Sequence, residues 1–255
     1  MRSAGMLAPI SALPNRHGIG DFGKSSYQFV KLLKKYGIKI WQILPLNPIG
    51  YGHSPYQPFS SKAMDENYIS LDMLIKKGYL KNVPNYKKNA SKVSYEEVRV
   101  FKNKYLYIAY KNALTQNPKL LDKFINDEKW VYNYAVFMAI KKKNYMVSWD
   151  NWSEEEKNWI KDHKLDLTPY EDEIYYQIFL QYVLKSQWNK LHEFANKLGI
   201  RIVGDVPFYV GYDSLDVWEN QDCFMLDEEL KPTLIAGVPP DYFSKTGQRW
   251  GNPIY

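Results

Sequence analysis

Apolar residues near the beginning of the chain form two short continuous runs with a helical pattern between them. The runs, Gly5 to Leu13 and Ile38 to Leu46, are typical of strands that are buried on both faces of a parallel sheet. Between them, apolar positions recur every three or four residues and predict a helix; these positions are Phe29, Leu32, Leu33 and Tyr36. A strand, a helix and a second strand predict one parallel βαβ unit.

The residues that flank this helix predict where it begins and ends. Asp21 or Ser25 can act as the N-cap, because short polar side chains accept hydrogen bonds from the first free amide groups of a helix. Gly37 stands where a glycine often follows the last turn, since glycine adopts the left-handed backbone conformation without strain. We therefore expect the helix to end just before Gly37.

The middle of the chain, residues 61–168, changes to lysine-rich helical patterns. Segments 96–114 and 129–144 predict helices, and Ser153 with Glu156 forms a capping-box pattern that predicts the start of another. We interpret this stretch as a helical insertion. The predicted domains are therefore 1–60, with the first two strands and the loop that follows them, 61–168 as the insertion subdomain, and 169–255 with a long helix, a third strand and a final loop.

The last part of the chain repeats the helix and strand pattern. Tyr170 to Leu198 predicts a long amphipathic helix closed by Gly199, and Ile200 to Val210 predicts a third buried strand that carries Asp205. The final segment, 235–255, is rich in Gly, Pro and aromatic residues and predicts a second binding loop. Alternating strands and helices favour an α/β barrel or a doubly wound sheet, and the absence of GxGxxG and GxxxxGK[ST] motifs disfavours nucleotide binding.

Composition narrows the class of protein. The 255 residues are 45% hydrophobic, which predicts a globular protein, and no apolar run approaches the length of a membrane span. The net charge of +6 comes mostly from lysine, whereas arginine is the residue that reads bases, so we expect a solvated surface rather than nucleic-acid binding. The single cysteine, Cys223, is interpreted as a core residue and fits a cytoplasmic location.

The loop GYGHSPYQPF, residues 50–59, places several aromatic rings where turns usually carry small polar residues. Rings beside Ser54, Gln57 and the tyrosine hydroxyls are what a sugar needs, because its C–H faces pack on rings while its hydroxyls form hydrogen bonds. The alternative is a rigid corner built from Pro and Gly. The final segment repeats this pattern with Asp241, Tyr242 and Phe243, so carbohydrate becomes the leading ligand class.

Candidate acid–base residues are few. Hydrolysis or transfer at a glycosidic bond needs two carboxyl groups, and Asp205 and Asp241 are the best candidates, although Asp205 could equally be a structural carboxylate. The acidic residues in nearby polar turns, Asp213, Asp216, Asp227, Glu228 and Glu229, are interpreted as solvated. The four histidines lack metal-ligand spacing, so we expect no metal site, and His53 is the only histidine inside the aromatic loop.

Four motifs together resemble the N-terminal half of the 4-α-glucanotransferases, the amylomaltase or disproportionating-enzyme family related to α-amylases. They are LPNRHGIGDFG (13–23), WQILPLNPIGYGHSPYQPFS (41–60), GDVPFYV (204–210) and AGVPPDYFSKTGQRWGNPIY (236–255). The resemblance implies an α/β fold, the N-terminal part of a (β/α)8 TIM barrel with about three strands and a large helical insertion. It also implies transfer of α-1,4-glucan segments between maltooligosaccharides or starch-type glucans by a retaining mechanism, without cofactor or metal.

The resemblance further implies roles for individual residues. Tyr51, Ser54 and Tyr56 are similar to glucan-contacting residues, and Asp205 resembles an aspartate that holds the sugar beside the scissile bond. The loop with Asp241, Tyr242 and Phe243 resembles a lid over the acceptor groove, with Gln248 and Trp250 beside the active site. Where the family often has an acidic residue, this chain has His53.

The same resemblance places both catalytic carboxylates after Tyr255, so none is expected in this chain. Three strands cannot close a barrel that needs eight, and we expect the fragment alone to be inactive and poorly soluble without the rest of the barrel. A truncated gene or protein piece would explain this. The alternative is a non-catalytic α-glucan-binding protein that kept the aromatic loops, and a third hypothesis, nucleic-acid binding, predicts a steep dependence on salt.

Overall fold

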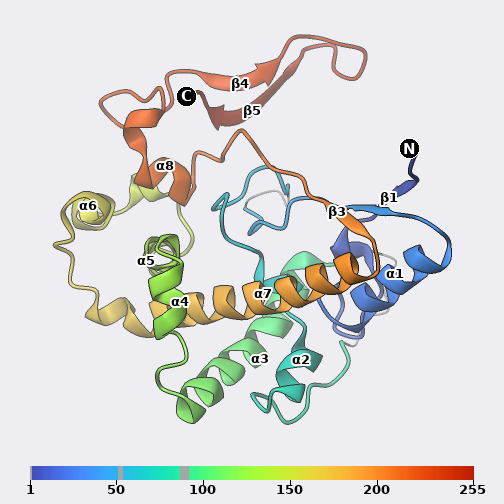
Figure 1. Ribbon diagram of the computed structural model, residues 1–255. Helices are drawn as coiled ribbons and strands as arrows, with labels where there is room; N and C mark the ends of the chain where they lie inside the picture. Colours follow the sequence, from blue (N-terminus) through green and yellow to red (C-terminus); the bar gives the residue numbers. More distant parts are fainter. Residues whose placement is uncertain (1, 51–53, 87–91) are drawn as a thin grey trace. The chain divides into compact units, whose positions relative to one another are not determined.

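The computed structural model describes residues 2–50, 54–86 and 92–255 (Figure 1). The chain folds into two compact units. The first consists of Met1–Leu46, Met64–Lys129 and Ile178–Asp205, and we call it the sheet unit. The second consists of Asn47–Ala63, Trp130–Gln177 and Val206–Tyr255, and we call it the hairpin unit. Each is built from three separate stretches of sequence, so both depend on contacts between distant residues.

The sheet unit contains a parallel sheet with the order β1-β2-β3. The strands are β1 (Gly5–Leu7), β2 (Ile40–Gln42) and β3 (Arg201–Val203). Trp41 stands in register with Met6 on one side and Ile202 on the other, and its buried indole N–H donates to the Ala8 carbonyl at 2.8 Å. The predicted parallel pairing of the three strands is therefore confirmed.

The strands are much shorter and more exposed than the apolar runs predict. After β1 the chain turns into a short 3-10 helix (Ile10–Ala12) that begins behind Pro9, which has no amide hydrogen for a sheet ladder. The side chains of Met6, Leu7 and Val203 are exposed, so the prediction of strands buried on both faces is wrong for these residues. A continuous apolar run reports hydrophobic content, whereas the length of a strand depends on where a neighbour pairs with it.

The first helix, α1 (Lys24–Lys35), lies between β1 and β2 as predicted, but its N-cap differs from the prediction. Gly23 occupies that position. The Asp21 carboxylate instead accepts the Gly23 amide at 2.8 Å inside the preceding turn, and the Ser25 hydroxyl donates to the Pro14 carbonyl. The other end is as predicted, because Gly37 adopts a φ of 71° directly after the last turn.

The helices predicted at 96–114, 129–144 and 170–198 are confirmed. The capping box of Ser153 and Glu156 is also present, and Gly199 follows the long helix with a φ of 75°. The helices are α2 (Leu71–Lys76), α3 (Tyr95–Gln116), α4 (Asp122–Asp127), α5 (Trp130–Lys143), α6 (Glu154–Asp162), α7 (Glu171–Lys197) and α8 (Leu215–Glu219). None of the described helices is long and apolar enough to cross a membrane.

Two glutamines on α7 fix the segment that leads into α2. The Gln181 amide exchanges hydrogen bonds with the backbone of Met64 at 3.0 and 2.9 Å. Gln187 does the same with Ser70, the residue before α2, at 2.7 and 3.2 Å. Both glutamines are buried, so these paired bonds satisfy amide groups that would otherwise be costly, and they hold the start of α2 against α7.

A group of buried polar residues lies inside the sheet unit. Lys102 is fully buried and its ammonium donates to the Asn67 carbonyl at 2.5 Å. Burial raises the pKa of Asp21, and the charge of Lys102 opposes that shift. His17 is also fully buried, and neither ring nitrogen has a hydrogen-bond partner in the described part of the chain. Burial, and next the charge of Arg16, lower the pKa of His17 to about 4.

Because the pKa of the buried His17 is lowered, we expect the free energy of unfolding to decrease in acid. Because the pKa of His17 is about 4 in the folded chain and 6.5 in the unfolded chain, only the unfolded chain takes up this proton between those values. The contribution of His17 is therefore complete above about pH 6.5 and is lost as the pH falls toward 4. We expect it to remove about 2 kcal/mol of unfolding free energy between pH 7 and pH 5.

The variant His17→Phe tests this expectation, because phenylalanine keeps a ring near Phe101, whose centroid is 6.3 Å away, and cannot be protonated. Urea unfolding at the two pH values measures the difference. The loss of stability on acidification should be about 2 kcal/mol smaller in the variant than in the native chain. Equal losses in both proteins would contradict this account of His17.

The hairpin unit is named for two antiparallel strands near the end of the chain (Figure 1). These are β4 (Ile235–Val238) and β5 (Gln248–Pro253), so segment 235–255, which predicted a loop, is a hairpin instead. Gly237 makes the pairing possible, because a Cβ atom there would lie 2.3 Å from the Gln248 carbonyl oxygen. The glycine that indicated a loop is thus what lets the two strands approach.

Candidate functional site

The aromatic loop of residues 54–59 is closed at its base and tied to β5. Ile49 pairs with Pro58 in an isolated antiparallel bridge, and the Phe59 amide donates to the Pro48 carbonyl at 3.2 Å. The side-chain amide of Gln57 donates to the backbone carbonyl of Trp250. The loop and the hairpin are almost two hundred residues apart in sequence, and this contact brings them together.

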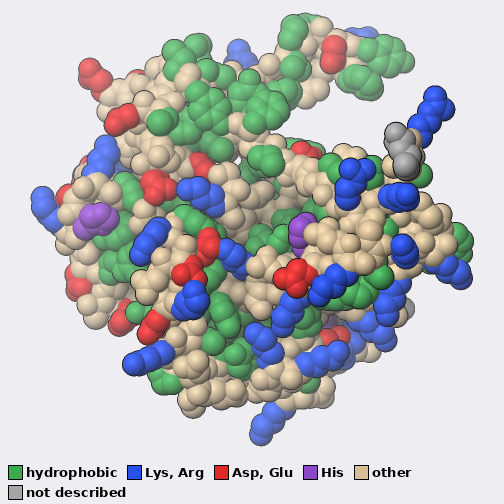
Figure 2. Space-filling model, viewed as in Figure 1, with side chains coloured by type: hydrophobic (Ala, Val, Ile, Leu, Met, Phe, Trp, Pro, Cys, Tyr) green, Lys and Arg blue, Asp and Glu red, His purple; other side chains and the backbone are tan. Residues whose placement is uncertain are grey.

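Exposed rings gather where the loop meets β5. Trp250 keeps 38% of its surface exposed and Tyr56 keeps 46%. The ring of Tyr209 lies 6.2 Å from that of Trp250 at an angle of 56°, and the Trp250 indole N–H donates to Gln248 at 3.0 Å. Figure 2 shows hydrophobic side chains gathered over the part of the hairpin unit that carries β4 and β5. The structure therefore brings Gln248 and Trp250 to the aromatic loop.

Tyr209, Phe208 and Asn252 join this site although none was among the predicted site residues. The buried Asn252 amide donates to the Val210 carbonyl at 2.9 Å, which holds β5 against the segment after β3. Phe208 is exposed, and its ring centroid lies 4.8 Å from that of Tyr209. The signal was present, since these two aromatic residues lie side by side in the motif GDVPFYV.

The turn of the hairpin presents two rings almost entirely to solvent. Tyr242 is 97% exposed and Phe243 is 87% exposed. Asp241 shapes this turn, because its carboxylate accepts the amides of Phe243 at 2.9 Å and Ser244 at 2.8 Å. A carboxylate that accepts two backbone amides is suited to holding the turn. The rings beside it are free to meet a ligand.

Two further predicted site residues, Asp205 and Ser54, lie within the described part of the chain. Asp205 belongs to the sheet unit, two residues after β3, and is partly exposed. Functional residues of parallel α/β folds gather at such carboxyl ends of strands. Ser54 is partly exposed, and its hydroxyl accepts the Tyr56 amide at 3.3 Å, so it also shapes its own loop. Tyr51 and His53 lie outside the described residues.

A buried ion pair contacts the aromatic loop at Phe59. The ammonium of Lys141, on α5, is fully buried and lies 2.5 Å from the Asp213 carboxylate and 4.9 Å from the centre of the Phe59 ring. The prediction that Asp213 is solvated is therefore wrong. It is also wrong for Asp216, which accepts the Ser61 amide at 2.8 Å. Burial lowers the pKa of Lys141 and raises the pKa of Asp213, and the charge of each group opposes the shift of the other.

Two kinds of reactive group remain, the thiol of Cys223 and clusters of side chains that could hold a metal ion. Cys223 is exposed, so it is not a core residue as predicted. Within residues 2–50, 54–86 and 92–255, no three His, Cys, Asp or Glu side chains are arranged to hold a metal ion. The candidate site instead consists of rings, amides and hydroxyl groups, which suits a neutral ligand with many hydroxyls.

Comparisons with known proteins show the family of this chain. The profile of the family described as 4-alpha-glucanotransferase matches residues 8–255, and the chain belongs to that family. The 4-alpha-glucanotransferase of Clostridium butyricum is 44% identical over 96% of this chain and 52% of its own length. That of Aquifex aeolicus is 42% identical over 100% of this chain and 53% of its own length. The chain therefore spans about half the length of the curated relatives it matches.

Solved structures confirm the predicted fold. The amylomaltase from Streptococcus agalactiae, in complex with acarbose, superposes with a TM-score of 0.92 and 38% identity over 100% of this chain and 53% of its own. The amylomaltase from Corynebacterium glutamicum gives 0.72 at 16% identity over 99% of this chain and 36% of its own, which supports the fold alone. The three parallel strands and the many helices thus form the N-terminal part of an amylomaltase barrel.

Proposed function

We propose that this chain supplies glucan-binding surface to a 4-α-glucanotransferase that moves α-1,4-linked segments between maltooligosaccharides. One observation carries the proposal: Gln57 ties the aromatic loop to Trp250, and exposed rings lie there beside amide and hydroxyl groups. Glucose rings offer C–H faces that pack on such side chains, and their hydroxyls can bond the polar groups. Membership of the family and the acarbose bound to a relative support the same ligand class.

The reaction we propose is a retaining double displacement. An aspartate attacks the anomeric carbon and forms a glycosyl-enzyme while an acid protonates the departing oxygen. The 4-hydroxyl of an acceptor glucan then attacks that carbon, gives its proton to the same group acting as base, and releases the aspartate. We assign both reacting carboxyls to the part of the family's fold beyond these 255 residues, and we assign to Asp205 the binding of the sugar beside the bond.

Rings on the hairpin turn suit a lid over the acceptor. Tyr242 and Phe243 project from a turn that Asp241 holds, so they can cover a bound glucan while the covalent intermediate lasts. Excluding water from that intermediate favours transfer to a sugar over hydrolysis. Tyr51, Ser54 and Tyr56 would contact the glucan from the aromatic loop, and Gln248 orients Trp250 through its hydrogen bond. A cytoplasmic location stays a prediction.

The product pattern from maltotriose tests this proposal. When these residues are part of a complete barrel, glucose and maltopentaose should appear together, because a maltosyl unit moves from one maltotriose to another. Hydrolysis would give glucose and maltose without maltopentaose, and that result would contradict transfer. The alternative of a non-catalytic glucan-binding protein has no support from the relatives, which are 4-alpha-glucanotransferases.

For residues 1–255 alone we expect binding of maltotriose without turnover. The reason is that the chain contributes sugar-binding groups, while the reacting carboxyls are assigned elsewhere in the family's fold. Chromatography of the sugars after prolonged incubation measures this, with the complete enzyme as the positive control. Maltopentaose formed by residues 1–255 would show that the reacting groups are already present, and the assignment of Asp205 to sugar binding would then fall.

A further inference from the structure

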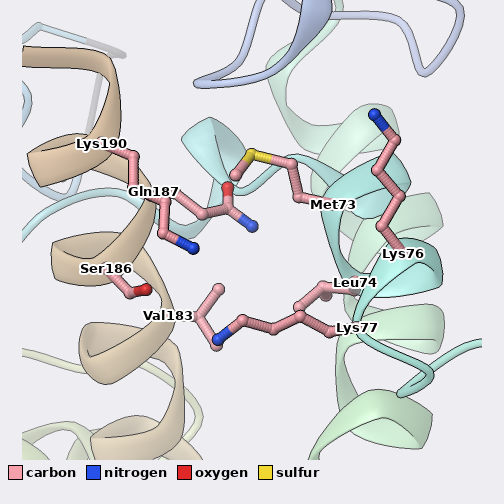
Figure 3. A pocket seen from close by; sticks show the side chains of 8 residues that line it. All are labelled: Met73, Leu74, Lys76, Lys77, Val183, Ser186, Gln187 and Lys190. Atoms are coloured by element: carbon pink, nitrogen blue, oxygen red, sulfur yellow. The ribbon is translucent and has the colours of Figure 1, made fainter. Parts of the chain in front are cut away.

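A cavity of about 190 Å³ opens between α2 and α7 in the sheet unit (Figure 3). It is distinct from the aromatic site, because every residue that lines it belongs to the sheet unit, whereas the aromatic loop and β5 belong to the hairpin unit. Met73 and Leu74 form the apolar side on α2, and Val183 forms it on α7. The Ser186 hydroxyl and the Gln187 amide add polar atoms to the α7 side.

The walls of this cavity are held at a fixed separation. Ser70 stands directly before α2, and both of its backbone groups bond to the Gln187 amide on α7. Both residues are buried, so this pair of hydrogen bonds is protected from competition by water. The opening between the helices is therefore part of the fold, and a ligand would enter it without first separating α2 from α7.

Two ammonium groups point into the cavity from opposite walls. Figure 3 shows the side chains of Lys77 and Lys190 directed into the space between the helices, whereas Lys76 points away from it. Among the described residues, neither Lys77 nor Lys190 has a carboxylate within ion-pair distance. The acidic residue of α2, Asp72, is bound to Arg16 at 2.5 Å.

The environment of Lys77 shows that the two charges act on each other. Although Lys77 is an exposed residue, partial desolvation of its ammonium, and next the positive charge of Lys190, lower the pKa of Lys77. The ammonium of Lys77 lies 5.6 Å from the centre of the Tyr79 ring and 5.5 Å from that of Tyr182, and these are its favourable partners. Two facing cations beside an apolar wall would be stabilised by an anion between them.

We propose that this cavity binds a small phosphate monoester, with the phosphate between Lys77 and Lys190 and the carbon part against Met73 and Val183. A dianion matches the two positive charges, and the cavity has room for only a few carbon atoms beyond the phosphate. The Ser186 hydroxyl can donate one further hydrogen bond to the ligand. The site does not depend on the glucan-binding surface, so binding should persist when that surface is altered.

Isothermal titration of the full chain with glycerol 3-phosphate tests the proposal, with inorganic phosphate, succinate and glycerol as comparison probes. We expect saturable binding of glycerol 3-phosphate, weaker binding of inorganic phosphate and succinate, and none of glycerol. Lys77→Gln and Lys190→Gln should each weaken binding of glycerol 3-phosphate about tenfold, because each removes one charge-assisted bond. Lys76→Gln is the matched control, and it should change affinity by less than about twofold.

Thermal unfolding separates lost binding from lost folding. Without ligand, Lys77→Gln and Lys190→Gln should unfold within about 2 °C of the native chain, because both side chains are exposed and such substitutions change stability little. The absence of saturable binding at about 10 mM glycerol 3-phosphate would overturn the proposal. Equal weakening by Lys76→Gln would overturn the cavity as the site, and equal affinity for succinate would overturn the assignment to phosphate.

Discussion

Asp213→Asn is expected to lower the free energy of unfolding by about 3–5 kcal/mol, because it removes the carboxylate that is paired directly with the buried ammonium of Lys141. The two groups lie 2.5 Å apart, and Lys141 is fully buried. Lys141 also donates to the Val147 carbonyl at 3.0 Å, which cannot replace the lost charge. Urea unfolding followed by tryptophan fluorescence measures the effect.

A double variant separates the pair from its individual members. Lys141→Met together with Asp213→Asn removes both charges, so it should lose clearly less stability than Asp213→Asn alone. Glu228→Gln, in an exposed turn, is the control and should change the unfolding free energy by less than about 0.5 kcal/mol. A loss below about 1 kcal/mol for Asp213→Asn would show that this ion pair does not stabilise the hairpin unit.

Asp205→Asn is expected to reduce transfer from maltotriose about a hundredfold in the complete enzyme. The reason is that a charged carboxylate bonds a sugar hydroxyl more strongly than a neutral amide, and such bonds are worth about 1.5–3 kcal/mol. Asp205 is partly exposed just beyond β3, so the change should leave folding nearly intact. The rate of glucose release at several maltotriose concentrations gives kcat/KM for both proteins.

Asp222→Asn serves as the matched control, since Asp222 is exposed and lies in a short 3-10 helix of the hairpin unit. It should leave kcat/KM within about twofold of the native value. If Asp205→Asn also left kcat/KM within that range, Asp205 would be a structural carboxylate, the alternative that the sequence left open. Equal unfolding midpoints for the two variants would exclude a folding defect as the cause.

The sequence predicted the local elements well where one stretch of residues carries the whole signal. The end of α1 just before Gly37 and the capping box of Ser153 and Glu156 each depend on residues only a few positions apart. The parallel order of the three strands also followed, because parallel strands need a crossover and helical patterns lie between them. Each of these features is set by short-range geometry, which can be read from the sequence.

Features that depend on distant partners could not be predicted in the same way. Asp213 stands in a polar turn, and nothing around it shows that the buried Lys141, 72 residues earlier, will meet it. The segment that became β5 contains Gly251, Asn252 and Pro253, residues that are rare in strands. Pairing with β4 overrides this local preference, and the same tertiary pairing brings Trp250 to Gln57.

The sequence therefore indicates which types of residue the candidate site contains, but it does not indicate how they contact one another. The aromatic residues Tyr56 and Trp250 predict a sugar ligand from the sequence alone. What the sequence could not supply is that Gln57 joins these two segments and that Tyr209 packs beside Trp250. The amides and rings that build the joint surface come from three parts of the chain, so no single motif contains it.

Titration of the chain with maltoheptaose, followed by tryptophan fluorescence, tests most directly whether the rings of the hairpin unit bind α-linked glucose units. We expect saturable binding that Trp250→Ala weakens about tenfold to hundredfold, through loss of the ring that faces the sugar, while Tyr36→Ala, which removes an exposed ring from the sheet unit, leaves it unchanged. The β-linked cellohexaose should not compete. Equal affinities for maltoheptaose in the native chain and in Trp250→Ala, or no binding at all, would contradict the account.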